Sequence, residues 1–105
     1  MTTPIAEPQE HTQTKQLPPY HVLIENDDEH SMDFVVMVLR KVFGYDDTKA
    51  HVLMQAAHEG GEAIVWTGSK EVAEWKLEQI GTFRENHWRD GRDIGPLRCR
   101  IEPAT

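Results

Sequence analysis

The chain has 105 residues, enough for one domain, and 38% of them are hydrophobic. Its net charge of −7 and sequence pI near 5.2 argue against binding to nucleic acid, which needs a basic face, and against binding to an anionic membrane surface. This balance favours a protein that binds other proteins or cationic groups.

Cysteine content and the lack of targeting signals indicate the compartment. Cys99 is the only cysteine, so neither an intramolecular disulfide nor a cysteine metal cluster can form. Residues 1–4 show no signal-peptide pattern, and no apolar run approaches the roughly 20 residues of a membrane span. We therefore expect a cytoplasmic protein.

Residues 1–18 differ in composition from the rest of the chain. They include Pro4, Pro8 and Pro18, many Thr, Gln and Glu residues, and no aromatic residue. Such a segment buries too little apolar area to offset the entropy of ordering it. The sequence therefore predicts a disordered N-terminal tail over 1–18 and a single folded domain over 19–105.

The domain begins with a strand and an amphipathic helix. Apolar and polar residues alternate over 20–25, which is typical of a strand with one buried face. Apolar residues then recur at helical spacing over 32–43. This helix is expected to begin after Asp28 or Ser31 as its N-cap and to end at Gly44.

The remaining elements follow from similar signals. A helix over 47–58 should stop at the glycine pair 60–61, and the apolar run 63–66 is of strand type. Ser69 should cap a long third helix, and a polar loop is expected over 86–95. Alternation at Leu97, Cys99 and Ile101 predicts a closing strand.

The predicted order is β-α-α-β-α-β. The simplest packing is an α/β (α+β) sandwich, in which a three-stranded antiparallel sheet is covered by three helices on one face.

Two polar features are candidates for a binding site. Asn26, Asp27 and Asp28 place two carboxylates and an amide on one turn, which could accept a cation or could simply form a turn with a helix cap. His58 falls at the predicted C-terminus of the second helix, where a capping role is also possible.

Apolar residues near these positions could form the core or line a pocket. Met32, Val35, Met54 and Ala57 lie on the inward faces of the first two helices.

Catalysis and metal binding find little support. His51 and His58 are seven residues apart, too far to share one ion without further ligands, and no His-Glu-x-x-His motif is present. Asp27 and His58 have no accompanying nucleophile, and no hydrolase motif or phosphate-binding glycine loop is present. We expect neither an enzyme nor a cofactor.

Several short motifs, in one order and spacing, resemble the ClpS family, the adaptors of the bacterial Clp protease that recognise N-degrons. The resemblance covers about residues 19–102. The matching segments are Tyr20 to Asp28, Met32-Asp33-Phe34-Val35, Met54 with Ala57-His58, Glu71-Val72-Ala73-Glu74-Trp75-Lys76, and Pro96-Leu97 with Cys99.

The resemblance implies a role for individual residues. Asn26, Asp27 and His58 would hold the α-ammonium group of the first residue of a substrate protein. The side chain of that first residue, of the large Leu, Phe, Tyr or Trp type, would enter a pocket. The pocket would be lined by Met32, Val35, Met54, Ala57 and Leu97, with Met32 as the gatekeeper.

The resemblance also implies a partner. Glu71 and Lys76 match the surface that docks on the AAA+ unfoldase of the Clp protease, of ClpA or ClpC type. In the family, the N-terminal tail engages the unfoldase when the substrate is handed over.

Three stretches depart from the usual pattern of the family. Glu29-His30-Ser31 stands where an aromatic-Thr-Pro stretch is usual, Ala57 is smaller than the common branched residue, and the loop 86–95 is longer. One alternative is an interaction domain that resembles the C-terminal domain of the ribosomal stalk protein, which shares the predicted layout but would not bind N-degrons.

Overall fold

The computed structural model describes residues 17–104, and it confirms the predicted α+β fold. The predicted tail lies outside the described residues except for its last two positions. The elements, in chain order, are β1 (Tyr20–Glu25), α2 (Met32–Phe43), α3 (Asp47–Gly60), β2 (Glu62–Gly68), α4 (Lys70–Gly81), β3 (Glu85–Asn86), β4 (Asp93–Gly95) and β5 (Cys99–Pro103).

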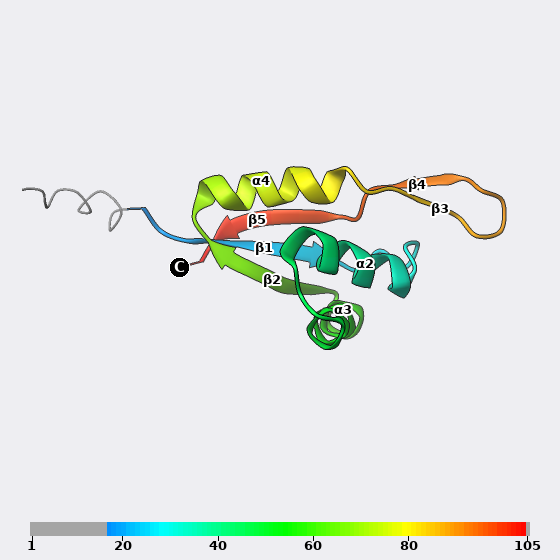
Figure 1. Ribbon diagram of the computed structural model, residues 1–105, viewed down its shortest axis with the longest axis horizontal. Coiled ribbons are helices and arrows are strands. Elements are labelled where there is room, and N and C mark those ends of the chain that lie inside the picture. Colours follow the sequence, from blue (N-terminus) through cyan, green and yellow to red (C-terminus); the bar gives the residue numbers. More distant parts are fainter. Residues whose placement is uncertain (1–16, 105) are drawn as a thin grey trace, which may run out of the picture.

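The main sheet has three antiparallel strands in the order β2-β1-β5, so the first strand is central (Figure 1). Ile24 of β1 is paired with Ala63 on one side and with Cys99 on the other. The ladder with β2 is irregular between Val22 and Leu23. Since β1 is bonded on both sides, its end is held rigidly, and the turn that follows it starts from a fixed point.

Side-chain caps explain where the helices begin. Of the two predicted caps of α2, Ser31 is the one used, because its Oγ accepts a hydrogen bond from the backbone N–H of Phe34 at 3.1 Å. Asp46 caps α3 in the same way. Helix α3 ends at Gly61, which has a φ of 90°, in agreement with the predicted glycine stop.

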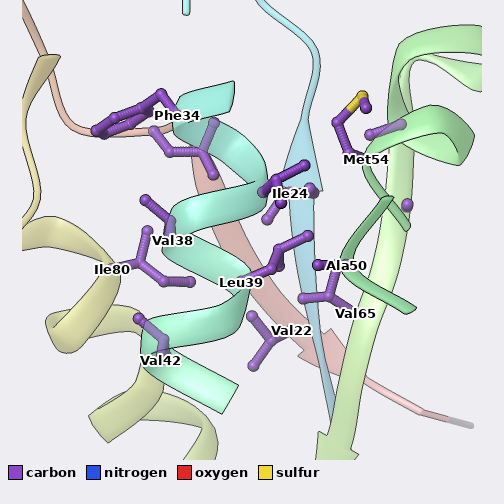
Figure 2. Packing of buried hydrophobic residues seen from close by; sticks show 14 of the residues in the cluster. Val22, Ile24, Phe34, Val38, Leu39, Val42, Ala50, Met54, Val65 and Ile80 are labelled. Atoms are coloured by element: carbon purple, nitrogen blue, oxygen red, sulfur yellow. The ribbon is translucent and has the colours of Figure 1, made fainter. Parts of the chain in front are cut away.

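The hydrophobic core lies between the sheet and the helices. Figure 2 shows Leu39 and Val38 of α2 facing the side chains of the strands and of α4, with Met54 of α3 at one end of the cluster. Leu39 is fully buried, as is Ile80 of α4. Helix α2 therefore contributes side chains to the centre of this core.

The other face of the sheet is held by charged residues. Arg100 on β5 lies 3.1 Å from Glu25 of β1 and 2.8 Å from Glu62 of β2, so one guanidinium links all three strands. Opposite charges on neighbouring strands support the pairing.

The prediction of a plain polar loop over 86–95 was wrong, because β3 and β4 pair there as an antiparallel hairpin. The N–H of His87 donates to the carbonyl of Arg92 at 2.7 Å, and Gly91 in the turn has a φ of 71°. The hairpin escapes sequence reasoning because its strands have only two and three residues and carry mostly polar side chains. It projects from the end of the molecule at which β1 finishes (Figure 1).

Candidate functional site

A cavity of about 270 Å³ opens where β1 ends, α2 begins and α3 ends. Pockets for drug-sized ligands usually measure roughly 300–1,000 Å³, so this one suits a single large side chain. All eight residues that the sequence predicted for the binding site line it, namely Asn26, Asp27, Met32, Val35, Met54, Ala57, His58 and Leu97.

The interior of the cavity is apolar. Met54, Ala57 and Leu97 are almost completely buried, whereas Met32 at the start of α2 is 45% exposed. Ile24 also lines the cavity and was not predicted as a site residue, although its inward position on β1 directly before the acidic turn was a usable signal. A side chain that entered here would exchange water for hydrocarbon contacts.

The carboxylate of Asp27 is engaged within its own turn. Its Oδ1 accepts hydrogen bonds from the backbone N–H groups of Glu29 at 3.0 Å and His30 at 3.1 Å, and its Oδ2 lies 2.6 Å from Nδ1 of His30. This carboxylate therefore organises residues 27–30 from the inside.

Those contacts change the acidity of Asp27. Burial alone would raise the pKa of Asp27, but the hydrogen bonds from the backbone of His30 and Glu29 and from the His30 ring outweigh it, so the pKa lies below its usual 3.8. A carboxyl group whose pKa is lowered by folding stabilises the fold above its unfolded pKa, and this contribution is lost as the pH falls through the folded value. The turn is therefore an acid-sensitive part of the site.

The carboxylate of Asp28 is more open than that of Asp27. Asp28 is exposed, has a φ of 63° and accepts one hydrogen bond, from the side-chain amide nitrogen of Asn26 at 3.2 Å. Because the amide nitrogen of Asn26 faces Asp28, its amide oxygen is left for another donor. Asp28 lines the cavity and was quoted in the sequence motif, but it was not assigned to the amino-group site.

The imidazole of His58 completes the polar rim. It is exposed in the last turn of α3 and lines the same cavity as the acidic turn at residues 26–28. The structure thus brings the ends of β1 and α3 together around one opening.

His30 is a residue of the site that sequence reasoning missed. Its side chain is only 3% exposed, stacks on Phe34 with ring centroids 5.1 Å apart, and places Nε2 2.8 Å from the carbonyl oxygen of Gly95. The sequence showed only that this position departs from the family pattern.

The two residues predicted for docking lie on α4, away from the cavity. Glu71 is exposed, whereas Lys76 is partly buried and donates from Nζ to the carbonyl oxygen of Val42 at 2.8 Å. The same ammonium lies 5.4 Å from the ring centroid of the exposed Trp75. Lys76 therefore also stabilises the C-terminal end of α2.

Chemistry other than binding has little basis in residues 17–104. No group of three or more His, Cys, Asp or Glu side chains in this part of the chain could hold a metal ion. Burial and the nearby charge of Glu25 raise the pKa of the Cys99 thiol to about 11, so it stays protonated at neutral pH and is a poor nucleophile. Among the described helices, none has the length and apolar character needed to span a bilayer.

Comparisons with known proteins agree on one family. The family model described as "ATP-dependent Clp protease adaptor protein ClpS" matches residues 15–100. The chain is 40% identical over 93 residues to the ATP-dependent Clp protease adapter protein ClpS of Aromatoleum aromaticum, covering 89% of this chain and 85% of that protein. It is 42% identical over 86 residues to the protein of that name from Salmonella arizonae, covering 81% and 74%.

A solved structure extends this agreement to three dimensions. The structure of Agrobacterium tumefaciens ClpS2 bound to L-phenylalaninamide matches with a TM-score of 0.66 at 30% identity, covering 82% of this chain and 96% of that chain. ClpS proteins are adaptors of a protease and are not themselves enzymes. The chain therefore belongs to the ClpS family of ATP-dependent Clp protease adaptor proteins.

Proposed function

We propose that this adaptor binds the free N-terminal residue of N-degron proteins, of the Leu, Phe, Tyr or Trp type, and delivers them to the AAA+ unfoldase of the Clp protease in the cytoplasm. The observation that carries this proposal is the apolar cavity with an acidic rim at the end of β1. L-Phenylalaninamide, the ligand in the Agrobacterium structure, has a free α-amino group beside a benzyl side chain, as an N-terminal phenylalanine does.

The polar rim fits an α-ammonium group. An ammonium has three N–H donors and a positive charge, so it binds best where several acceptors converge. The free amide oxygen of Asn26, the exposed carboxylate of Asp28 and a neutral imidazole of His58 would supply three acceptors. Asp27 fixes the turn on which Asn26 and Asp28 stand.

The apolar interior fits the side chain of the first residue. Burying a side chain such as Leu or Phe contributes about 1.5–3 kcal/mol. Val35, Met54, Ala57 and Leu97 would form the walls, and the half-exposed Met32 at the rim would disfavour side chains that branch at Cβ. The small Ala57 leaves room that favours a large aromatic residue.

Titration of a fluorescent peptide that begins with a free phenylalanine tests the proposal. We expect a dissociation constant in the micromolar range for the free peptide. When the same peptide is N-acetylated, we expect the affinity to fall by at least about 100-fold. Acetylation removes the charge and two donors, each charge-assisted hydrogen bond contributes roughly 1.5–3 kcal/mol, and about 1.4 kcal/mol is a factor of ten. A peptide with the same composition but an N-terminal aspartate is the control for the cavity. Equal affinity for the free and acetylated peptides would reject the proposal.

Delivery requires a second surface, which we place on α4 around Glu71, Trp75 and Lys76. Glu71 lines a hollow of about 880 Å³ next to residues 17–20, where the predicted tail joins the domain. A docking surface at this point would keep the tail close to the bound unfoldase. Trp75 is 57% exposed, and exposed aromatic residues are enriched where proteins bind each other.

Reversing the charge at Glu71 is expected to separate delivery from recognition. The Glu71→Arg variant should slow unfoldase-dependent degradation of a phenylalanine-starting reporter by at least about tenfold, because a like charge placed in an interface costs several kcal/mol, while leaving peptide affinity unchanged. Val52→Arg, which adds the same side chain on the exposed face of α3, is the matched control. Unchanged degradation with Glu71→Arg would place the docking surface elsewhere. Lys76 is less suitable for this test because its substitution also frees the carbonyl of Val42.

A further inference from the structure

Both ring nitrogens of His30 face oxygen atoms that only accept hydrogen bonds. Nδ1 lies 2.6 Å from Oδ2 of the Asp27 carboxylate, and Nε2 lies 2.8 Å from the carbonyl oxygen of Gly95. An ionised carboxylate and a backbone carbonyl have no proton to give. The two contacts can therefore be hydrogen bonds at the same time only when both ring nitrogens carry a proton, that is, when His30 is an imidazolium.

The surroundings of His30 favour this charged form. The ring is 3% exposed, stacks on Phe34 and touches a carboxylate whose own pKa is lowered. A buried charge is stable when it is paired and fully hydrogen-bonded, and here both N–H groups have a partner.

We propose that His30 is a positioning residue of the amino-group site, which in its doubly protonated form ties the Asp27 carboxylate to the end of β4. The proposal rests on the proposed function, because it assigns His30 a role in holding the polar rim in its binding geometry. Asp27 fixes the turn that carries Asn26 and Asp28, and Gly95 lies two residues before Leu97 of the cavity wall. One side chain thus connects the polar rim to the apolar wall.

Neighbouring residues support the same connection. Ser31 donates from its backbone N–H and its Oγ to the two carboxylate oxygens of Glu85, at 2.9 and 2.6 Å. Glu29 pairs with Arg92 at 3.5 Å. Three consecutive residues of the turn therefore each hold the hairpin of β3 and β4. The two stretches that depart most from the usual family pattern, 29–31 and 86–95, contact each other.

Other charged groups face this contact from both sides. On the turn, Asp27 faces the ring directly and Glu29 is neutralised by its pair with the hairpin. On the hairpin, Glu85 is held by Ser31, and Asp93 is paired with Arg84 at 2.8 Å. Among these carboxylates, that of Asp27 is the one in direct contact with the ring.

The consequence is a pH dependence of peptide binding. When His30 loses a proton, one of its two hydrogen bonds is lost and the turn separates from the hairpin, so binding should weaken as the pH rises. Loss of the peptide's own α-amino proton also weakens binding at high pH, but it affects every variant equally.

The first experiment is NMR on the ¹⁵N-labelled, ligand-free protein, which tests the ring without relying on any substrate. At pH 7 we expect both ring nitrogens of His30 to show the chemical shifts and one-bond couplings of protonated nitrogens. A single protonated nitrogen on His30 would overturn the proposal.

The second experiment measures the affinity for the phenylalanine-starting peptide between pH 5.5 and 8.5. At pH 6.5 we expect His30→Gln to bind about tenfold more weakly than the wild type, in line with the loss of one charge-assisted bond, and to lack the part of the alkaline weakening that exceeds the titration of the peptide. His51→Gln, which changes an exposed histidine of α3 in the same way, should match the wild type. A wild-type affinity and pH profile for a folded His30→Gln would refute the positioning role. The acetylated peptide separates the two proposals: if the wild type binds it equally well, the proposed function fails, whatever the NMR result is.

Discussion

The Asp28→Asn variant is expected to bind a phenylalanine-starting peptide about 10- to 100-fold more weakly than the wild type, with an unchanged free energy of unfolding. The substitution removes one negative charge and keeps the shape of the side chain, and a charge-assisted hydrogen bond contributes roughly 1.5–3 kcal/mol. Asparagine also tolerates the φ of 63° found at this position, so the backbone need not change. Isothermal titration gives the affinity, and urea denaturation gives the stability.

Comparison with Asp27→Asn shows which of the two carboxylates binds the ammonium group directly. We expect Asp27→Asn to lose both stability and affinity, because its carboxylate accepts two backbone hydrogen bonds and faces His30. Glu78→Gln on the exposed side of α4 removes a charge at a distance and should change neither. If Asp28→Asn binds normally while Asp27→Asn folds normally but does not bind, Asp27 is the direct acceptor, as the family resemblance implied.

The Leu39→Ala variant is expected to lose about 2–5 kcal/mol of unfolding free energy, the usual range for a leucine truncated in a packed core. Leu39 is completely buried, and Figure 2 shows it between β1 and the start of α3. Domains of this size are stabilised by only roughly 5–15 kcal/mol, so the variant should be partly unfolded at moderate temperature. Urea denaturation followed by circular dichroism measures the loss.

The control is the matching truncation on the surface. Val52 on α3 is 62% exposed, so Val52→Ala should change the stability by no more than about 0.5 kcal/mol. A loss below about 1 kcal/mol for Leu39→Ala would show that the core relaxes around the deletion and that α2 is held in another way. Because α2 carries Met32 and Val35, its loosening should also reduce the affinity for the peptide.

Local patterns in the sequence were enough to predict most of the fold. Each of these signals depends on a few neighbouring residues: the alternation at Tyr20 to Glu25, the helical spacing that ends at Gly44 and the cap at Ser69. The structure has these elements where they were expected. The hairpin was missed because its strands are short and mostly polar, and because some of the contacts that hold it come from distant residues, including Glu85 with Ser31 and Gly95 with His30.

The residues that line the cavity could be named from the sequence because the resemblance to the ClpS family implied them, and the structure places Asn26, Met54 and His58 around one opening. What each polar group does there was decided by the tertiary structure. Asp27 is engaged within its turn and Asp28 is left open, and His30, which contacts Asp27, has a second contact to a carbonyl 65 residues along the chain. Periodicity indicates which face of an element is buried, but a hydrogen bond between distant residues produces no periodic pattern, so only the folded chain shows that the turn is connected to the hairpin through His30.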